Sequence, residues 1–526
     1  CGICVRTCDE IVGVAAIDFV QRGFDTTIGS APDQSWIESD CVSCGECIVR
    51  CPTGALSFTG FEIPEREVTT TCTYCGCGCG IHLGVTGDRL VSARGQRENP
   101  SNEGRLCVKG RFGFTFVNSP DRLKTPLIRR NGTLEEATWD EALDLVAEKF
   151  SAARGDAFAA IASAKLTNEE NYLIQKFSRA VMGTNNVDHC ARLCHSPSVA
   201  GLVQSFGSGA MTSSSKDLGD ARCIFAIGTN TTAAHPIIGL QVMRSIRAGG
   251  KLIVVNPRAI ELARHADLFI QNRAGSDVAL LMGMMRVIVD EGLHDAQFIE
   301  ARCENFEAFR ESLAEYDEAT VEEKTGVPFA QVAEAARMYA QNSPAAILYA
   351  MGITQHTHGT DNVLATSNLA MLTGNVGLPS GGVNPLRGQS NVQGACDMGA
   401  LPNVYPGYQK VDLPEVKAKF EQAWGVELDD APGLTHLEIL RGVTAGPIRA
   451  IYLVGENPAL SEADATHARE AMEKVDFLVV QDIFRTESAE YADVVLPAAS
   501  FAEKDGTFTN TERRVQRVRK AIPPVG

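Results

Sequence analysis

The sequence lacks any long apolar run, and it carries too little positive charge for a protein that binds nucleic acid. No stretch of the 526-residue chain reaches the ~20 consecutive apolar residues that a membrane-spanning helix needs, so we expect no membrane span. The formal net charge is −17, whereas binding to phosphate backbones requires clustered lysine and arginine. Nucleic acid is therefore excluded as a partner, but small anionic ligands are not.

The sequence also lacks an initiator methionine, because residue 1 is a cysteine that already belongs to a motif. We therefore expect further sequence ahead of Cys1, and the chain gives no test of a signal peptide. The 17 cysteines do not indicate a disulfide scaffold, since such scaffolds are short secreted chains. Twelve of them fall within the first 107 residues, mostly at spacings of two and three. This bunching indicates metal ligation, and it predicts a reducing, cytoplasmic location.

The second group of cysteines has the complete spacing of a bacterial ferredoxin, C-x2-C-x2-C-x3-C-P at residues 41–52. In that pattern three thiolates from one turn bind one iron–sulfur cube, and the fourth cysteine reaches the neighbouring cube. The first group has the same spacing with its first cysteine missing. The pattern assigns one [4Fe–4S] cluster to four residues: Cys8, Cys41, Cys44 and Cys47. It assigns a second cluster, with one ligand ahead of the chain, to Cys1, Cys4 and Cys51.

A third group of cysteines follows the ferredoxin motifs, and its expected ligands are Cys72, Cys75, Cys79 and Cys107. Four cysteines also suit zinc, but the two ferredoxin motifs just upstream favour a third [4Fe–4S] cluster. Cys77 falls between the ligands and is interpreted as a bystander. Three clusters in a row form an electron path that does no substrate chemistry, so the chemistry must lie at one end of it.

The remainder of the chain contains an internal repeat of apolar segments. CIFAIGTN, KLIVVNPR and HADLFI in the first copy are answered by IYLVGEN, FLVVQDIF and YADVVLP, at residues 223–270 and 451–497. Each copy reads as strand, glycine turn, helix, strand, polar residue and strand, which is typical of a unit that binds a nucleotide at the carboxyl ends of its strands. The alternative is a duplicated α/β layer without a ligand. The candidate contacts are Gly228, Asn230, Asn256, Arg258, Gly455, Asn457 and Asp482.

The third cysteine group, with Lys109 after its last member, and the duplicated α/β units together resemble the molybdopterin oxidoreductase family. The resemblance implies one molybdenum or tungsten ion held between two pterins, as bis-molybdopterin guanine dinucleotide. The fused segment with two ferredoxin motifs resembles that of cytoplasmic formate dehydrogenase catalytic subunits. By the same resemblance Lys109 lies between the pterin and the third cluster and eases electron passage.

The resemblance implies an α/β multidomain fold with four domains. We expect a ferredoxin-like domain with two [4Fe–4S] clusters at residues 1–62 and a small [4Fe–4S] domain at 68–118. Two related α/β dinucleotide-binding domains follow: one spans 191–387, and the other is discontinuous, at 119–190 and 388–526. Members of the family usually continue with a closing domain that covers the pterins, and we expect this chain to lack it.

The segment NNVDHCARLCHSPSVAG at 185–201 resembles the active-site segment of formate dehydrogenases, where a cysteine or selenocysteine ligates the metal and a histidine follows. The resemblance implies Cys194 as the metal ligand and His195 as the group that orients substrate or receives its proton. A thiolate suits a soft, redox-active metal, and a nearly neutral imidazole suits proton transfer. Cys190 competes as the ligand but lacks the adjacent histidine.

Two further segments resemble parts of the same site. GVNPLRGQSNVQGACDMGALP at 382–402 implies that Arg387 lies at the substrate, since a guanidinium can hold a carboxylate by two parallel hydrogen bonds. The alternative for Arg387 is a contact to a pterin phosphate. Gln389 in this segment, and Gln355 in MGITQHTHG at 351–359, are candidate pterin contacts.

Taken together, the resemblance implies a molybdenum- or tungsten-dependent formate dehydrogenase that interconverts formate and carbon dioxide. Electrons would leave through the [4Fe–4S] clusters to a flavin subunit that reduces NAD, to a hydrogenase or to a ferredoxin. Two alternatives stay open. One is another member of the family, such as a nitrate reductase, and the other is a non-catalytic iron–sulfur relay subunit of the complex I type.

Overall fold

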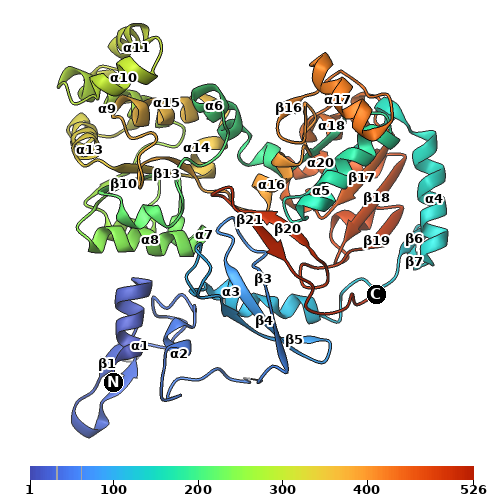
Figure 1. The fold of residues 1–526 in the computed structure, drawn as a ribbon, viewed down its shortest axis with the longest axis horizontal. Helices are drawn as coiled ribbons and strands as arrows, with labels where there is room; N and C mark the ends of the chain where they lie inside the picture. The colour runs from blue at the N-terminus through green and yellow to red at the C-terminus, as the bar shows by residue number, and fades with distance from the viewer. Residues whose placement is uncertain (31–33, 61) are drawn as a thin grey trace.

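Figure 1 shows four units in the computed structural model, which describes residues 1–30, 34–60 and 62–526. A small N-terminal unit and a three-stranded antiparallel sheet occupy the lower half of the view, and two larger α/β units lie above them. Within the described residues, no helix combines the length and the apolar character needed to cross a bilayer.

The N-terminal unit has short elements and little apolar core. Its regular elements are α1 (Ile3–Arg6), a π-helix (Thr7–Val12), the hairpin strands β1 (Asp18–Val20) and β2 (Thr27–Gly29), and α2 (Glu46–Val49). Cys4 and Ile17 are the buried hydrophobic side chains among the described residues of this unit. A unit with so little apolar burial needs another source of stability, and bound metal is one such source.

The small antiparallel sheet carries the third group of cysteines. It consists of β3 (Arg66–Thr71), β4 (Gly80–Thr86) and β5 (Arg89–Gly95), and α3 (Val108–Phe112) follows it. The loop between β3 and β4 holds three of the four cysteines. The backbone N–H of Cys72 donates to the carbonyl of Cys79 at 2.9 Å, which closes this loop at its base.

The first α/β unit is built on a five-stranded parallel sheet. Its strands, in spatial order, are β12 (Leu268–Ile270), β11 (Lys251–Val255), β10 (Cys223–Ile227), β13 (Ala345–Tyr349) and β14 (Gly382–Pro385). Phe225 and Ile227 of β10 belong to one core cluster, and Ile224 and Ala226 belong to another. Both faces of the sheet are therefore covered, which is why its strands read as continuous apolar runs.

Helices cover the two faces of this sheet. One face packs against α9 (Asp277–Asp290), α13 (Phe329–Gln341) and α15 (Gly359–Leu372), and the other packs against α8 (Pro236–Arg247). The further helices of this unit are α6 (Ser196–Phe206), α7 (Thr231–Ala234), α10 (Ala296–Arg302), α11 (Phe306–Ser312), α12 (Glu318–Thr325) and α14 (Met351–Thr354).

The second α/β unit is built on a seven-stranded sheet whose strands come from two distant parts of the chain. In spatial order these are β7 (Thr133–Glu136), β6 (Leu127–Arg130), β19 (Val494–Pro497), β18 (Phe477–Asp482), β17 (Ala450–Val454), β8 (Phe158–Ala162) and β9 (Val187–His189). The five strands from β19 to β9 are parallel, and β6 and β7 are antiparallel additions at one edge.

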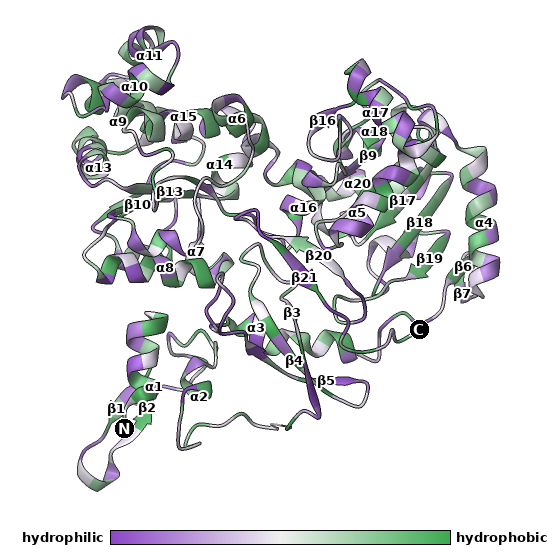
Figure 2. Ribbon diagram, in the orientation of Figure 1, coloured by the Kyte–Doolittle hydropathy of each residue, from purple (hydrophilic) through white to green (hydrophobic). Residues whose placement is uncertain are grey.

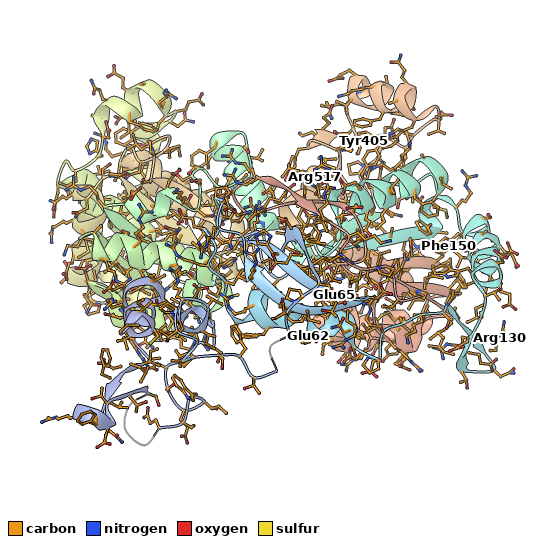
Figure 3. All side chains as sticks on the ribbon, turned by 60° about the horizontal axis from the view of Figure 1, so that its bottom comes forward. Glu62, Glu65, Arg130, Phe150, Tyr405 and Arg517 are labelled. Atoms are coloured by element: carbon orange, nitrogen blue, oxygen red, sulfur yellow. The ribbon has the colours of Figure 1, made fainter. Side chains whose placement is uncertain are left out.

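An aromatic cluster anchors one face of this sheet. The ring of Phe150, labelled in Figure 3, lies 4.9 Å from that of Phe158 and 5.9 Å from that of Phe477. Figure 2 shows the strands of both sheets as predominantly hydrophobic. The helices of this unit are α4 (Trp139–Ala152), α5 (Asn168–Lys176), α16 (Val392–Asp397), α17 (Pro414–Trp424), α18 (His436–Ala445), α19 (Pro458–Ser461) and α20 (Ala465–Lys474). A short hairpin accompanies them, formed by β15 (Val404–Tyr405) and β16 (Gln409–Lys410).

The two copies of the sequence repeat occupy equivalent places in the two sheets. Neighbouring parallel strands β12, β11 and β10 hold the first copy, and β19, β18 and β17 hold the second. The glycine after the first strand of each copy has a left-handed backbone, with φ of +59° at Gly228 and +65° at Gly455. This conformation favours glycine. At both positions it turns the backbone out of the strand and into the loop at the carboxyl end of the sheet.

The chain returns to the small sheet near its end. The hairpin of β20 (Gly506–Thr509) and β21 (Val515–Val518) lies between the larger units in Figure 1. The Thr71 hydroxyl donates to the carbonyl of Arg517 at 2.9 Å, and the backbone N–H of Arg519 donates to the Thr70 hydroxyl at 2.9 Å. The hairpin thus joins the third cysteine group to the second α/β unit.

Candidate functional site

Arg387 lies in the loop after β14, in the interior of the molecule, with only 1% of its surface exposed. One terminal nitrogen, Nη2, donates to the carbonyl of Gly209 at 2.6 Å. Its Nε and Nη1 atoms are buried and have no hydrogen-bond partner in the described part of the chain. Unpaired buried donors on a charged group are costly, and a bound anion is one partner that would satisfy them.

The backbone of Arg387 is held on both sides. Its N–H donates to the Thr511 hydroxyl at 3.1 Å, and its carbonyl accepts a hydrogen bond from Nε2 of His235 at 2.7 Å. The third cysteine group also approaches this point, because a Cβ placed on Gly76 would lie 2.3 Å from the Arg387 carbonyl oxygen. Glycine is therefore required at position 76, and the cysteine loop lies against the arginine loop.

Cys194 lies at the end of a short 3-10 helix, Cys190–Leu193, just before α6. The Thr354 hydroxyl donates to its carbonyl at 2.6 Å and fixes the turn. Burial raises the pKa of the Cys194 thiol to about 11, and the positive charge of Arg387 opposes this rise. The thiol and the guanidinium therefore share one region, and a bound metal ion would deprotonate the thiol outright.

His195 is fully buried beside this region. Its Nδ1 atom is 2.8 Å from the Ser198 hydroxyl, which also accepts a hydrogen bond from the Tyr349 hydroxyl at 3.0 Å. The Nε2 atom has no partner among the described residues. Burial lowers the pKa of His195 well below its usual value, and the charge of Arg387 lowers it further.

Other predicted residues surround the Cys194 turn. Gln355 donates from Nε2 to the carbonyl of Leu193 at 2.8 Å, which ties its loop to the residue before Cys194. Gln389 accepts a hydrogen bond from the Cys190 thiol at 2.8 Å. The thiol of Cys190, the competing candidate ligand, is thus engaged with Gln389.

The third cysteine group lines one enclosed cavity, whose wall includes Cys72, Cys75, Cys79, Cys107 and Lys109. Cys77 is not part of this wall. The four cysteine side chains that line this cavity are the ligand set predicted for the third iron–sulfur cluster.

The cysteines of the N-terminal unit also approach one another. Burial raises the pKa of the Cys47 thiol, and the nearby Cys8 and Cys41 thiolates raise it further. This grouping agrees with the ferredoxin ligand pattern, in which a cysteine of the first motif joins the second motif. Cys1 is exposed, Cys4 is buried, and Cys51 lies near the Thr53 hydroxyl at 3.6 Å.

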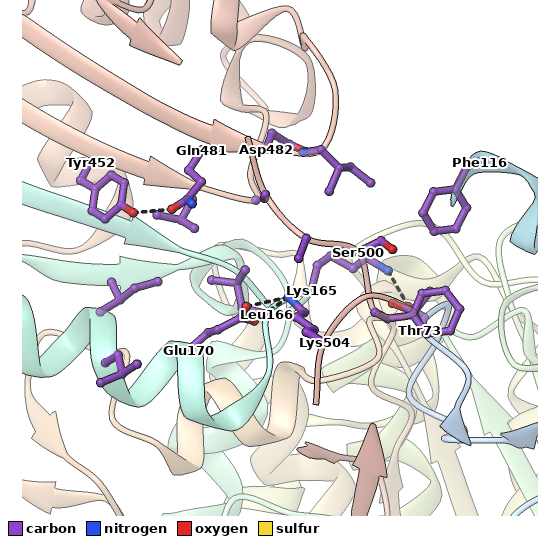
Figure 4. Close-up of a pocket in the computed structure, with 18 of the residues that line it drawn as sticks. Thr73, Phe116, Lys165, Leu166, Glu170, Tyr452, Gln481, Asp482, Ser500 and Lys504 are labelled. Carbon is purple, nitrogen blue, oxygen red and sulfur yellow. Dashed lines mark hydrogen bonds and ion pairs between the residues drawn. The ribbon is translucent and has the colours of Figure 1, made fainter. Parts of the chain in front are cut away.

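A cavity of about 600 Å³ lies at the carboxyl ends of the strands of the seven-stranded sheet. Two predicted residues, Gly455 and Asp482, line it. Figure 4 shows it in close-up, with Asp482 on one wall and an ion pair between Lys504 and Glu170, at 2.7 Å, on another. Burial raises the pKa of Asp482 to about 6.

Lys165 also lines this cavity, and sequence reasoning missed it. Its Nζ atom donates to the carbonyls of Thr73 at 3.3 Å and Tyr74 at 3.1 Å, between two cysteines of the third group (Figure 4 shows the first of these bonds). The cavity therefore reaches the cysteine loop. A signal was present, because Lys165 lies in the loop that follows the apolar run of β8, as Gly455 lies in the loop that follows β17.

The remaining predicted residues do not line this cavity. Asn457 donates to Glu487 at 2.6 Å and accepts from Ser488, so its side chain is used in local bonds. Asn230 and Asn256 accept local hydrogen bonds from the Thr232 hydroxyl and the Arg258 N–H. The turn at Gly228 instead contacts α14, because a Cβ on Gly228 would lie 2.8 Å from the Gly352 backbone.

Three family models match the chain in succession. The model of the 4Fe-4S dicluster domain matches residues 1–55, that of the molybdopterin oxidoreductase Fe4S4 domain matches 65–119, and that of molybdopterin oxidoreductase matches 122–526. The chain belongs to the molybdopterin oxidoreductase family. This confirms the predicted family and the α/β multidomain fold with iron–sulfur domains, and it places iron–sulfur clusters and a molybdenum or tungsten pterin among its cofactors.

Curated relatives in this family include several formate dehydrogenases. The F420-dependent formate dehydrogenase 1 subunit alpha of Methanococcus maripaludis is 50% identical over 460 residues, which are 87% of this chain and 68% of that protein. Formate dehydrogenase H of Escherichia coli is 46% identical over 471 residues, covering 87% of this chain and 66% of that protein. The probable oxidoreductase YjgC of Bacillus subtilis is 39% identical, covering 100% of this chain and 58% of that protein.

Among solved structures, acetylene hydratase from Pelobacter acetylenicus has a similar fold. Its TM-score is 0.73 at 23% sequence identity, and the match covers 88% of this chain and 67% of that one. This likeness concerns the fold of the molybdopterin enzyme family alone. The chain is therefore homologous to formate dehydrogenase alpha subunits over most of its length, within a fold that also supports another activity.

Proposed function

We propose that this chain is the catalytic subunit of a formate dehydrogenase, which oxidises formate to carbon dioxide, two electrons and a proton. The observation that carries the proposal is Arg387, which is buried beside Cys194 and has two donors without a partner among the described residues. Homology to formate dehydrogenase alpha subunits supports the same substrate. Formate, the smallest carboxylate, suits a buried site that offers a single guanidinium.

Arg387 binds the substrate. Nη2 keeps a second N–H besides the one that the Gly209 carbonyl accepts. It can act with Nε or with Nη1, which have no partner among the described residues, to donate two parallel hydrogen bonds to one carboxylate. His235 and Thr511 hold the backbone, so the side chain is oriented before formate arrives. Holding the two formate oxygens directs the C–H bond, which is the bond that breaks, away from the guanidinium.

The pterin is held at the meeting of the two α/β units. Cys194 is the protein ligand of the molybdenum or tungsten ion, and Gln355 and Gln389 are pterin contacts beside it. When bound, the metal pterin supplies the acceptor for the two electrons. The guanine dinucleotide form is supported by the cavity of about 600 Å³ at the ends of β8, β17 and β18, since parallel sheets bind nucleotides at that edge. Gly455, Asp482 and Lys165 face this ligand.

His195 accepts the proton and passes it on, because burial and the Arg387 charge lower the pKa of its ring, so that the ring is neutral before the reaction and releases the proton readily afterwards. Formate, HCOO⁻, becomes carbon dioxide by losing two electrons and one proton, so a base must lie near the reacting bond. Nε2 of His195 is buried and unpartnered in the described part of the chain, while Ser198 holds Nδ1 and fixes the ring. The ring therefore presents one nitrogen to the site.

Electrons then leave through three [4Fe–4S] clusters held by the cysteine groups named above. Lys165 and Lys109 lie at the end of this path that faces the pterin, where positive charge stabilises an arriving electron. A separate electron-accepting protein takes the electrons from the N-terminal clusters. A flavin subunit that reduces NAD, a hydrogenase and a ferredoxin all satisfy this chemistry.

The proposal is tested by formate-dependent reduction of a viologen dye, with anaerobically purified protein whose molybdenum, tungsten and iron contents are measured. We expect Arg387→Ala and Cys194→Ala to lose at least a hundredfold in activity. Arg302→Ala and Cys303→Ala are matched controls outside the site, and they should keep wild-type activity. Arg387→Lys keeps the charge but not the paired donors, so its loss of activity should appear mainly as a higher KM for formate.

The alternatives give different results. Metal-loaded protein that is inert with formate but reduces nitrate would contradict the formate assignment while leaving the family intact. Protein that holds iron but neither molybdenum nor tungsten would instead indicate an electron-relay subunit. Full activity of Arg387→Ala with formate would remove Arg387 from the substrate site.

A further inference from the structure

A buried ion pair joins the N-terminal unit to the unit of the third cysteine group. Arg111 of α3 and Glu46 of α2 bind each other, and their side chains are only 3% and 2% exposed. They come from sequence positions 65 residues apart. Replacing a buried ion pair by apolar groups is often neutral or stabilising, so its presence here is not explained by stability alone.

Each member of the pair also binds the backbone beside a cysteine of the opposite unit. Arg111 donates from Nε to the carbonyl of Cys44 at 2.6 Å. Glu46 accepts at Oε1 from the backbone N–H of Leu106 at 3.1 Å, which is the residue before Cys107. Cys44 and Cys107 further line one shared cavity of about 220 Å³. The ion pair therefore spans the gap between two proposed cluster sites.

The approach of the two units at this point is close. A Cβ on Gly45 would lie 2.7 Å from Cδ of Arg111, and Gly45 has a φ of +71°, so glycine is required there twice over. The rings of Phe58 and Phe112 meet edge to face at 5.3 Å beside the pair. This packing fixes the direction in which the Arg111 side chain reaches Cys44.

The charges of the pair act on the clusters in opposite directions. Arg111 places a positive charge at the carbonyl of Cys44, and Glu46 places a negative charge beside it, with Arg50 binding its other oxygen at 3.2 Å. Buried charges are weakly screened. Reduction adds negative charge to a cluster, so a neighbouring cation favours the reduced state and a neighbouring anion disfavours it.

We propose that Arg111 and Glu46 are positioning residues for electron transfer between the cluster at Cys44 and the cluster at Cys107. They fix the two sites relative to each other, and their charges set the reduction potential of the Cys44 cluster. The inference rests on the electron path of the proposed function. It does not depend on which substrate supplies the electrons.

The test is a redox titration followed by electron paramagnetic resonance, with dithionite as the reductant so that formate is not needed. We expect Arg111→Gln to lower the midpoint potential of the Cys44 cluster and Glu46→Gln to raise it. Arg111→Lys should stay near the wild type because it keeps the charge. The double variant Arg111→Gln/Glu46→Gln should return toward the wild-type potential, as charges that act on one site offset each other.

A control separates electrostatics from general damage. Arg94 and Glu67 form an exposed ion pair in the same small sheet, and Arg94→Gln should leave the spectrum and the potentials unchanged. Midpoint potentials that shift in the same direction in Arg111→Gln and Glu46→Gln would overturn the proposal. An effect of lost packing does not depend on the sign of the charge that is removed, whereas an electrostatic effect does. Unchanged potentials in iron-loaded variants would overturn it as well. Formate-dependent viologen reduction is measured in a separate assay, so that failure of the formate assignment can be distinguished from failure of this proposal.

Discussion

At the scale of single residues, the chemistry of the site depends on groups that have unused bonding capacity. Arg387 keeps two donors free, and His195 keeps one ring nitrogen free, although both are buried within the part of the chain that the structure describes. The sequence identified both residues as candidate site residues from the short segments that contain them. It could not predict their partners, because Gly209 is 178 residues from Arg387 and His235 is 152 residues away.

His235 is the clearest test at this scale, because it contacts the Arg387 backbone and not the substrate. We expect His235→Ala to raise KM for formate and to lower kcat/KM about tenfold, equivalent to ~1.4 kcal/mol. The reason is that the Arg387 carbonyl loses its 2.7 Å hydrogen bond and the guanidinium is less well positioned. Steady-state kinetics of protein with matched metal content would show this.

Two comparisons make the His235 result specific. His235→Gln retains a side-chain N–H donor and should recover part of the loss. Loss of molybdenum, tungsten or iron in His235→Ala, with unchanged activity per bound metal, would argue for a role in cofactor retention instead.

At the scale of elements, the parallel strands explain where the ligand-facing groups lie. Lys165 and Gly455 follow β8 and β17, and Asp482 is the last residue of β18. These three strands are neighbours in the seven-stranded sheet. Carboxyl ends of parallel strands meet at one edge, so residues far apart in sequence line one cavity. The repeat predicted two of these three, but β8 lies outside the repeat and Lys165 was missed.

Asp482 gives a pH-dependent prediction. Burial raises its pKa to about 6, against 3.8 for a free aspartate, so ionisation penalises the folded state. The contribution of the neutral carboxyl to the free energy of unfolding is fully present below about pH 4 and is lost as the pH rises through 6. We expect pterin-free wild type to lose about 1 kcal/mol of stability relative to Asp482→Asn between pH 5 and pH 7.5.

Urea unfolding of both proteins at the two pH values measures this difference. The amide of the Asp482→Asn variant would still offer an oxygen to the Ile483 N–H, which donates to the Asp482 carboxylate at 2.6 Å in the wild type, and this keeps the comparison close. Asp144→Asn, at an exposed position of α4, should show no such trend. A pH-independent difference for Asp482→Asn would mean that the carboxyl is not held neutral by burial.

At the scale of the whole molecule, the site exists only where separate units meet. The cysteine loop at Gly76 lies against Arg387, and Gly76 donates to the Gly388 carbonyl at 3.3 Å while its own carbonyl accepts from Thr511 at 2.8 Å. Residues of the third cysteine group, the first α/β unit and the C-terminal hairpin segment therefore converge. The proposed electron path and the proposed substrate site share this junction.

Gly76→Ala tests the junction directly. Its new Cβ would lie 2.3 Å from the Arg387 carbonyl oxygen, an overlap of backbone that no side-chain rotation relieves. We expect a loss of about 1–3 kcal/mol in stability and a higher KM for formate. Gly29→Ala is the control, since its nearest neighbour is the Val20 side chain at 3.2 Å. Wild-type KM and stability in Gly76→Ala would show that the two loops are not in close contact.

The sequence by itself determined the family, the iron–sulfur motifs and the α/β class of the fold, because local spacing and apolar periodicity carry these features. The assignment of Cys194, His195 and Arg387 rests on short segments, and their roles stay predictions, as do the domain boundaries. Only the tertiary structure decided that Lys165 faces the large cavity, that His235 holds Arg387 and that Arg111 reaches Cys44. Those contacts join residues 67 to 152 positions apart, and packing between units, which no local pattern encodes, brings them together.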